Sequence, residues 1–409
     1  MPPVFHHKGK HISARPAAKA FYRTHAYLVE HTNAPVRRDL MDEIDWSDRL
    51  IGIKGTRGVG KTTFLLQYAK EKFGTDRSCL FINMNNFYFS GHSIVDFANE
   101  FQKRGGKVLL IDQVFKHPEW SRELRMCYDR FPSLKIVFTG SSVMRLKEEN
   151  LELRDIAKSY NLRGFSFREF LNLQTGMKFR AYSLEEILST HEQIAKGVLS
   201  KVRPLDYFQD YLHHGFYPFF LEKRNFSENL LKTMNMMVEV DILLIKQIEL
   251  KYLSKIKKLL YLLAVDGPKA PNVSQLASDI QTSRATIMNY IKYLADARLI
   301  NLVYPKGEEF PKKPSKIMMH NSNLMYSIYP VKVEEQDVLD TFFVNTLWKD
   351  HKVHKGDKNV SFMVDEVMPF KICAEGAKIK NNPDVTYALQ KAEIGRGNQI
   401  PLWMFGFLY

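Results

Sequence analysis

Residues 55–62 read GTRGVGKT, a spacing of glycines, lysine and a hydroxyl residue that is typical of a loop that cradles phosphates. Backbone N–H groups and a helix N-terminus surround phosphate oxygens in such loops, and side chains larger than glycine would crowd them. We expect Lys61 to reach the β and γ phosphates and the Thr62 hydroxyl to ligate Mg²⁺. The candidate nucleotide-binding residues are Gly55, Thr56, Arg57, Gly58, Val59, Gly60, Lys61, Thr62 and Thr63.

The segments around this loop fit the same chemistry. RLIGIKG before it has the composition of a buried strand, and TTFLLQYAKEKF after it has the apolar spacing of a helix. A second apolar strand, residues 107–112, ends in an acid, as the magnesium-side strand of such a protein should. Asp112 is therefore the second candidate magnesium ligand, acting through a metal-bound water.

Residue 113 decides whether the expected ATP is hydrolysed or only held. Many ATPases carry a glutamate here to accept charge from the attacking water, whereas this chain has Gln113. An amide cannot take the proton, although it can orient a water. We therefore expect ATP binding with slowed hydrolysis, and the candidate catalytic residues are Lys61, Asp112 and Gln113. The alternative for Gln113 is an ordinary polar residue at a strand end.

A further apolar strand, residues 134–142, ends in hydroxyl residues that could sense the γ phosphate. Thr139, Ser141 and Ser142 are the candidates, and the sequence does not say which one points inward. Ser141 and Ser142 could equally form a helix cap or a turn. We therefore carry Thr139 forward as the candidate nucleotide-binding residue.

Length and composition indicate a globular protein of two or three domains. The 409 residues are 45% hydrophobic and 25% charged, and the longest apolar runs are too short to cross a membrane. The N-terminus lacks the apolar core of a signal peptide, so we expect a cytoplasmic protein with no membrane partner. The three cysteines form no CxxC pair, which favours buried thiols over a disulfide or zinc site.

The charge balance leaves room for a polyanionic partner. Lys and Arg outnumber Asp and Glu by 59 to 45, a net charge of +14. Basic charge can steer a protein to nucleic acid or to anionic membrane surfaces. Here it is spread along the chain, so simple solubility charge explains it as well.

Residues 176–310 predict two helical modules. SLEEILS begins a helix with Ser183 and Glu186 at the spacing of a capping box. Residues 251–310 have the pattern of a helix-turn-helix followed by a strand pair, the winged-helix arrangement. If this module binds double-stranded DNA, we expect the start of its second helix to contact base edges and the strand-pair connection to contact phosphates. The base-contact candidates are Ser283, Arg284, Thr286 and Asn289, and the phosphate-contact candidates are Lys306, Lys312 and Lys313. The alternative is an interdomain lid.

Four stretches together resemble the prokaryotic AAA-family ATPases that carry a carboxy-terminal domain of unknown function. They are IKGTRGVGKTTFLLQYAKEKF, KVLLIDQVFKHPEWSRELRMCYDRFPSLKIVFTGSSVMRL, LRGFSFREFL and EIGRGNQIPLWMFGFLY. The resemblance runs from about residue 35 and implies an AAA+-like ATPase core, a winged helix and a domain similar to the restriction-endonuclease fold. It supplies no substrate.

The expected fold class is α/β, with a P-loop AAA+-like parallel sheet followed by helical and winged-helix segments and a small nuclease-like domain. The expected domains are an N-terminal extension at 1–35, the ATPase core at 36–175, a helical segment at 176–250, the winged helix at 251–328 and the nuclease-like domain at 329–409.

Two departures from the family pattern concern the ATPase core. The family usually has Glu where this chain has Gln113, and an arginine pair where this chain has Asp155 and Ile156. Arg154 is the nearest arginine that could touch a neighbour's γ phosphate. An aspartate would also be expected near Asn85. Since the arginine pair is absent, a monomer or dimer is as defensible as a ring.

The nuclease-like domain lacks one of the acids that its chemistry needs. Two carboxylates must hold magnesium while a lysine assists the water. Asp365 would be the first acid, but Lys371 stands where the second is wanted, and neither Glu375 nor Lys378 restores the spacing. With Asp340 as a remaining acid, we expect an inactive nuclease-like fold.

Two functions follow from these patterns. The first is a nucleotide-dependent switch that binds ATP and Mg²⁺ and hydrolyses ATP slowly because of Gln113. The alternative is a DNA-associated regulator that uses its winged helix and binds ATP without turnover.

Overall fold

The computed structural model describes residues 14–146, 150–222, 225–379 and 382–409, with the side chains of residues 14–18 left out. The chain forms two compact units. Unit 1 comprises residues 1–53, 61–140 and 146–160, and unit 2 comprises residues 54–60, 141–145 and 161–409. Each unit is described by itself.

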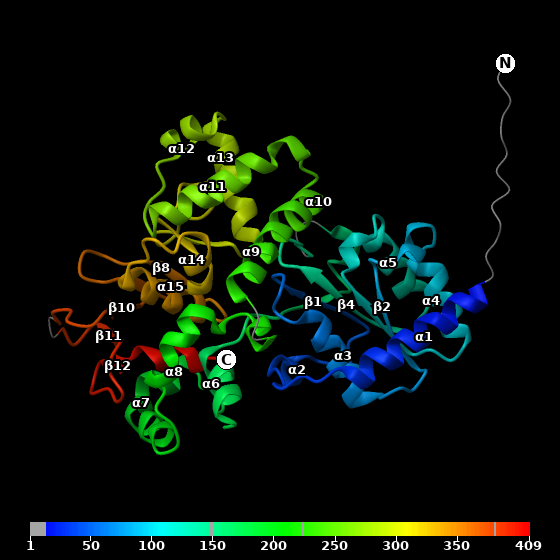
Figure 1. Ribbon diagram of the computed structural model, residues 1–409, viewed down its shortest axis with the longest axis horizontal. Helices are drawn as coiled ribbons and strands as arrows, with labels where there is room; N and C mark the ends of the chain where they lie inside the picture. Colours follow the sequence, from blue (N-terminus) through cyan, green and yellow to red (C-terminus); the bar gives the residue numbers. More distant parts are fainter. Residues whose placement is uncertain (1–13, 147–149, 223–224, 380–381) are drawn as a thin grey trace. The chain divides into compact units, whose positions relative to one another are not determined.

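A five-stranded sheet in the order β2-β3-β4-β1-β5 is the centre of unit 1 (Figure 1). Its strands are β1 Leu50–Gly55, β2 Cys79–Asn83, β3 Val108–Asp112, β4 Lys135–Ser141 and β5 Lys158–Asn161. β3 is parallel to both β2 and β4, and Asn83 at the end of β2 is the register partner of Asp112 at the end of β3. The expected α/β fold with a P-loop type of parallel sheet is confirmed.

Helices around this sheet bury its apolar strands. They are α1 Ala14–His31, α2 Leu40–Glu43, α3 Lys61–Lys72, α4 Ile94–Lys103 and α5 Trp120–Arg130. All five residues of β3 are buried, which is the pattern of a parallel strand covered on both faces. α1 and α3 pack on each other and on β2, whereas α4 packs on α5. The chain thus brings the carboxyl ends of β3 and its neighbours to one edge of the sheet.

Unit 2 begins with a series of short helical segments. The α-helices are α6 Phe167–Thr175, α7 Leu184–Leu199, α8 Leu205–Asp210, α9 Phe226–Met236 and α10 Leu243–Lys246. Between them lie π-helical turns at Tyr211–Gly215 and Met237–Ile242 and a 3₁₀ segment at Pro218–Glu222. The helical pattern expected for this region is therefore present, with wide turns that the spacing alone did not indicate.

Three helices and a strand pair follow, within residues 253–319. They are α11 Leu253–Asp266, α12 Val273–Ile280, α13 Arg284–Asp296, β6 Ile300–Val303 and β7 Lys316–Met319. β6 and β7 pair in antiparallel register, and the three helices pack on one another. Ser283 caps α13, because its side chain accepts a hydrogen bond from the backbone N–H of Thr286.

A mixed sheet packed on a helix closes the chain. Its elements are α14 Ser322–Ile328, α15 Glu335–Leu347, β8 Val353–Lys355, β9 Phe362–Val364, β10 Met368–Cys373, β11 Thr386–Leu389 and β12 Gln399–Pro401. The strand order is β12-β11-β10-β9-β8, with β10, β11 and β12 parallel and β8, β9 and β10 antiparallel. Phe343 of α15, Phe370 of β10 and Phe405 near the C-terminus meet in its core.

The described helices and cysteines bear on membrane insertion and on thiol chemistry. In the part of the chain that the structure describes, no helix is both long and apolar enough to span a bilayer. Cys79, Cys127 and Cys373 are buried, unbonded thiols. Burial raises the pKa of the Cys79 and Cys127 thiols to about 12, which keeps them in the unreactive protonated form at neutral pH.

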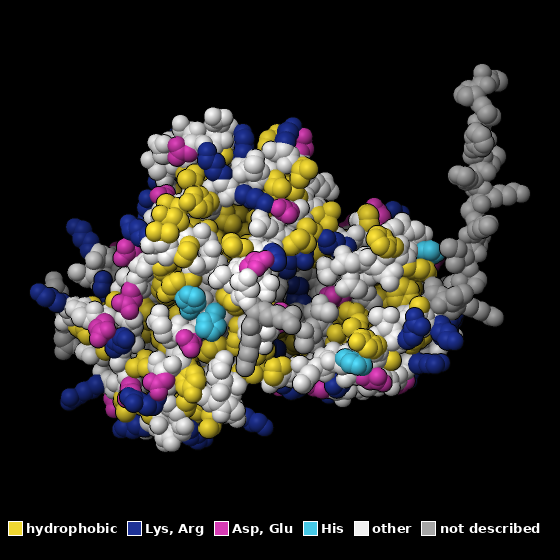
Figure 2. Space-filling view, in the orientation of Figure 1, with side chains coloured by type: hydrophobic (Ala, Val, Ile, Leu, Met, Phe, Trp, Pro, Cys, Tyr) yellow, Lys and Arg dark blue, Asp and Glu magenta, His cyan; other side chains and the backbone are white. Residues whose placement is uncertain are grey.

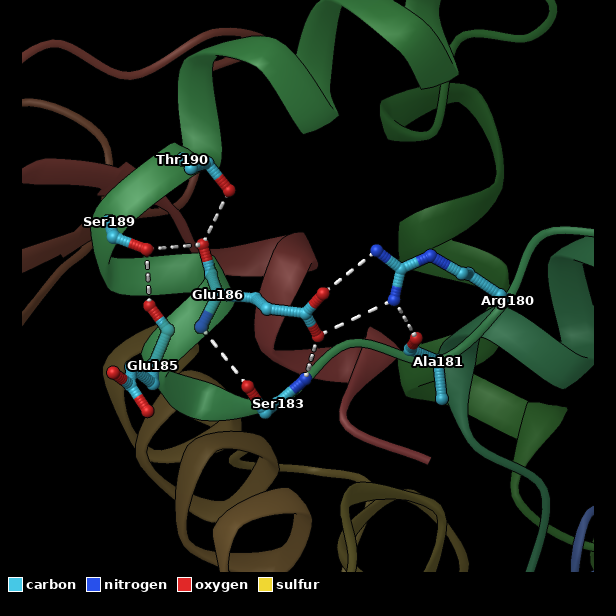
Figure 3. Close-up of polar contacts among 7 residues, drawn as sticks. All are labelled: Arg180, Ala181, Ser183, Glu185, Glu186, Ser189 and Thr190. Atoms are coloured by element: carbon cyan, nitrogen blue, oxygen red, sulfur yellow. Dashed lines mark hydrogen bonds and ion pairs between the residues drawn. The ribbon is translucent and has the colours of Figure 1, made fainter.

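The capping box expected at the start of α7 is present (Figure 3). The Ser183 hydroxyl accepts from the backbone N–H of Glu186 at 3.1 Å, and the Glu186 carboxylate accepts from the backbone N–H of Ser183 at 2.8 Å. Arg180 donates to the same carboxylate at 2.8 Å and, with the Ser183 N–H, holds its pKa below the usual range. The box satisfies helix-end N–H groups that otherwise have no partner inside the helix.

Replacing the cap should loosen α7. We expect Ser183→Ala to lower the local stability of the helix by about 1 kcal/mol, because the N–H of Glu186 loses its acceptor. Hydrogen exchange of the α7 amides measures this opening.

The stabilisation of α7 by the Glu186 carboxylate should depend on pH. It should be fully present above the unfolded pKa of Glu186 and be lost as the pH falls through its lowered folded pKa.

Ser189→Ala is the matched control, because the Ser189 hydroxyl only donates to carbonyls of its own helix. Equal amide protection in Ser183→Ala and Ser189→Ala would contradict the role of the cap.

Candidate nucleotide site

The glycine loop has the backbone shape that its motif requires. Gly58 and Gly60 lie at φ +86° and +91°, in the left-handed region that residues with a Cβ rarely adopt. A Cβ added to Gly58 would also lie 3.1 Å from the Phe219 ring. Both positions therefore need glycine for their backbone conformation, and a Cβ at position 58 would also require the Phe219 ring to shift slightly.

The other side chains of residues 55–60 are engaged within unit 2. Thr56 and Val59 are buried, with 4% and 0% of their surface exposed. The Arg57 guanidinium forms an ion pair with the Asp241 carboxylate at 2.5 Å. These contacts hold the side chains of the loop in place without a bound nucleotide.

The rest of the motif opens α3 in unit 1. Lys61, Thr62 and Thr63 are its first three residues. The Thr62 hydroxyl donates to Oδ2 of Asp112 at 2.8 Å, so the two candidate magnesium ligands lie in direct contact. Thr63 is exposed, and no contact of its side chain points to a role.

Asp112 is the centre of a hydrogen-bond cluster at the carboxyl edge of the sheet. Its side chain is 1% exposed and accepts hydrogen bonds from three other side chains. The donors are Thr62 at 2.8 Å, Asn83 Nδ2 at 2.8 Å and the Thr139 hydroxyl at 2.5 Å. Because a buried carboxylate is costly unless it is hydrogen-bonded, these donors keep Asp112 in place.

The structure separates the three hydroxyl candidates at the end of β4. Thr139 contacts Asp112, and its oxygen also accepts from the backbone N–H of Gln113 at 2.9 Å. Ser141 instead donates to Asp241 within unit 2 at 3.1 Å. The Ser142 hydroxyl is buried without a hydrogen-bond partner. Only Thr139 joins the cluster around Asp112.

Gln113 follows this cluster in a left-handed backbone conformation, with φ 55° and ψ 48°. Such a conformation costs a residue with a Cβ roughly 1 kcal/mol and needs support from its surroundings. The hydrogen bond from its N–H to Thr139 supplies part of that support. Its side chain is half-buried.

Asn83 is the member of the cluster that sequence reasoning missed. The expectation centred on Asn85, which is exposed and donates its backbone N–H to the Asn83 side chain at 2.8 Å. Since β2 and β3 are parallel neighbours, the last residue of β2 had to lie beside Asp112. Arg154, the nearest candidate for an arginine finger, is exposed in unit 1.

Most of the candidate DNA-contact residues are exposed, and several of them contact other side chains of this protein. Arg284 and Asn289 are exposed on α13, whereas the hydroxyls of Ser283 and Thr286 lie 2.9 Å apart in the helix cap. In the strand-pair connection, Lys306 pairs with Glu366 at 3.0 Å and Lys312 with Glu308 at 3.4 Å. Lys313 is exposed. On the face drawn in Figure 2, Lys and Arg side chains are scattered and form no single patch.

The candidate nuclease acids have separate partners. Asp365 lies between β9 and β10 and accepts from His351 Nδ1 at 2.6 Å, and these contacts hold its pKa below the usual range despite partial burial. Asp340 is buried and pairs with Lys316 at 3.1 Å. Lys371 lies in β10. Within the described ranges no group of three His, Cys, Asp or Glu residues could hold a metal ion.

Two segments of the chain match known families. Residues 47–171 match an AAA domain, and residues 205–332 match a domain of unknown function, DUF8612. Residues 47–171 are thus similar to AAA domains, and the following segment is similar to DUF8612. Both matches end before residue 333, so the resemblance of residues 329–409 to the restriction-endonuclease fold gains no support.

Related curated proteins have no described activity. Two uncharacterized proteins of Methanocaldococcus jannaschii, MJ1637 and MJ1544, are 28% and 26% identical over 313 and 267 residues. The alignments cover 73% and 61% of this chain. They cover 65% and 55% of the relatives, so the chain spans less than two thirds of their length.

Solved structures with some likeness include ORC1 of Aeropyrum pernix in complex with DNA and AMPPCP-bound DnaA of Aquifex aeolicus. ORC1 is 10% identical with a TM-score of 0.30, covering 76% of this chain and 92% of that chain. DnaA is 12% identical with a TM-score of 0.25, covering 72% and 90%. Both TM-scores lie below 0.5, and neither likeness bears on the function or partners of this chain.

Removing the Thr139 hydroxyl should destabilise unit 1. We expect Thr139→Val, which keeps the shape, to lower the free energy of unfolding by about 1–3 kcal/mol, because Gln113 N–H and Asp112 each lose a buried partner. Urea unfolding followed by circular dichroism measures the loss. Thr139→Ser keeps the hydroxyl and is the control. A larger loss in the serine variant would contradict the role of the hydroxyl.

Proposed function

We propose that this chain binds Mg-ATP through residues 55–63, hydrolyses it slowly and works as a nucleotide-dependent switch. The observation that carries the proposal is the direct hydrogen bond between Thr62 and the buried Asp112, at the start of the helix that follows the glycine loop. The AAA-domain match over residues 47–171 supports the same site.

The residues present fit a hydrated magnesium ion. Mg²⁺ prefers oxygen ligands, keeps several waters and usually takes few protein ligands. The Thr62 hydroxyl and the Asp112 carboxylate supply such oxygens, and the two groups are hydrogen-bonded to each other. Thr62 would bind the ion directly and Asp112 would hold one of its waters, while Asn83 and Thr139 orient the carboxylate. The bound ion would neutralise charge on the phosphates.

The loop and Lys61 would hold the phosphates. Backbone N–H groups of residues 58–62 point at phosphate oxygens in loops of this shape, and the Lys61 ammonium adds a positive charge at the β and γ phosphates. Gln113 would orient the attacking water through its side-chain amide without taking the proton. This assignment supports tight binding together with slow turnover.

Substitutions should separate binding from hydrolysis. We expect Lys61→Ala to lower ATP affinity at least tenfold, because the phosphates lose their main positive charge. Gln113→Glu should raise the rate of phosphate release by about tenfold or more, because a carboxylate can accept the proton that an amide cannot. Calorimetric titration with Mg-ATP and a phosphate-release assay measure the two effects.

Lys103→Ala is the control, since Lys103 is an exposed lysine of α4 that pairs with Glu100 of the same helix. Unchanged ATP affinity in Lys61→Ala would contradict the proposed site, and an unchanged rate in Gln113→Glu would contradict the role given to residue 113.

A DNA-associated regulator is the second candidate. The observation in its favour is that Arg284 and Asn289 are exposed on α13, the second helix of a helix-turn-helix arrangement followed by a strand pair. A long donor side chain and an amide on the second helix suit contacts to base edges. The ion pairs of Lys306 and Lys312 would compete with phosphate contacts, so we expect weak binding to duplex DNA.

Arg284→Ala should weaken binding to a 20-base-pair duplex about fivefold or more, because a guanidinium contact to a base or phosphate is lost. Wild-type affinity should fall steeply as salt is raised from 50 to 200 mM, through counterion release. Fluorescence anisotropy measures both. Lys251→Ala is the control, because Lys251 is an exposed lysine whose side chain forms an ion pair with Glu249. Absence of duplex binding by the wild type at 50 mM salt would end this candidate.

A further inference from the structure

An ion pair holds Arg57, the one charged side chain of residues 55–60. Arg57 Nη2 lies 2.5 Å from Oδ1 of Asp241, and the two side chains are 24% and 5% exposed. Arg57 and Asp241 are both in unit 2. Asp241 lies in the π-helical turn Met237–Ile242, inside the segment that matches DUF8612. A segment with no described function thus contacts the candidate phosphate loop.

Asp241 makes a second contact that fixes its position. Its Oδ2 accepts from the Ser141 hydroxyl at 3.1 Å, while Oδ1 faces Arg57. Ser141 is 2% exposed and is the last residue of β4, the strand that carries Thr139. A carboxylate this buried needs partners for both oxygens, and here each oxygen has one. The geometry therefore leaves the Arg57 side chain little freedom to turn elsewhere.

Further contacts hold the same loop against the DUF8612 segment. The Thr56 hydroxyl lies 3.4 Å from the carbonyl oxygen of Ala297 and 3.5 Å from Sδ of Met237. Phe219 and Tyr217 limit the space beside Gly58. Contacts from three places in residues 205–332 therefore meet Thr56, Arg57 and Gly58, the first variable positions of the motif and its middle glycine.

We propose that Asp241 is a positioning residue for ATP binding, which holds the glycine loop in its phosphate-ready shape through Arg57. The proposal rests on the proposed function of residues 55–63. When the loop already has its phosphate-binding conformation, less binding free energy is lost in ordering it. Loss of the Arg57–Asp241 ion pair therefore lowers the affinity for phosphates. By linkage, ATP that favours this loop shape also favours the attached conformation of the turn at Met237–Ile242. The ion pair is then the connection between nucleotide and the DUF8612 segment.

A double-mutant cycle on ATP affinity tests this connection. Asp241→Asn and Arg57→Ala should each weaken Mg-ATP binding roughly tenfold, in the range of common coupling effects. The double variant should be no weaker than either single variant by more than about twofold, because both act through one contact. Calorimetric titration of the full chain measures the affinities, at a temperature where circular dichroism shows every variant folded.

Asp296→Asn is the matched control. Asp296 is a largely buried carboxylate of unit 2, 10% exposed, whose ion pairs go to Lys292, Arg145 and Lys246 and not to the glycine loop. It should leave ATP affinity within about twofold of wild type, whatever it does to stability. An equal loss of affinity in Asp296→Asn would show that general damage to unit 2 explains the effect, and would overturn the proposal.

Lys61→Ala separates failure of this inference from failure of the proposed function. If Lys61→Ala loses ATP while Asp241→Asn binds like wild type, the site stands and the positioning role is wrong. If the two losses in the cycle multiply, Asp241 does not act through Arg57, and the role is equally wrong. If Lys61→Ala binds ATP like wild type, the proposed function itself fails.

Discussion

The cost of burying one carboxylate organises the edge of the sheet in unit 1. Asp112 is 1% exposed, and such a group is tolerated only where hydrogen bonds replace the water that it has lost. Three donors come from three elements, namely the first turn of α3, the end of β2 and the end of β4. Loss of any one donor leaves part of the hydrogen-bonding capacity of this buried carboxylate unmet. The ends of these elements therefore have little freedom to move independently.

Much of this site could be predicted from the sequence, because its chemistry is local. The glycine positions, Lys61 and Thr62 follow each other in one short motif, and an apolar strand that ends in an acid marks Asp112. The strand-loop-helix order and the capping box at Ser183 also depend on neighbouring residues. Patterns of this kind survive in a single sequence, since the interactions that they encode span only a few residues.

The rest depends on contacts between residues far apart in the chain, which no spacing encodes. Asn83 and Thr139 join Asp112 only because their strands are its neighbours in the sheet. Asp241 meets Arg57 across 184 positions of the chain. The choice of Thr139 over Ser141 likewise depends on the distant residue that each one meets, Asp112 for Thr139 and Asp241 for Ser141. Strand order and helix placement decide such contacts, so the sequence could offer candidates but could not choose among them.

The central claim is that residues 55–63 and Asp112 together bind Mg-ATP. The most direct test is a calorimetric titration of the wild-type chain with ATP, once with Mg²⁺ and once with the metal removed by a chelator. The account predicts saturable binding of one nucleotide per chain, weaker by tenfold or more without Mg²⁺, because Thr62 and Asp112 then have no ion to hold. Absence of binding at millimolar Mg-ATP, or an ATP affinity that is the same with and without Mg²⁺, would contradict this claim.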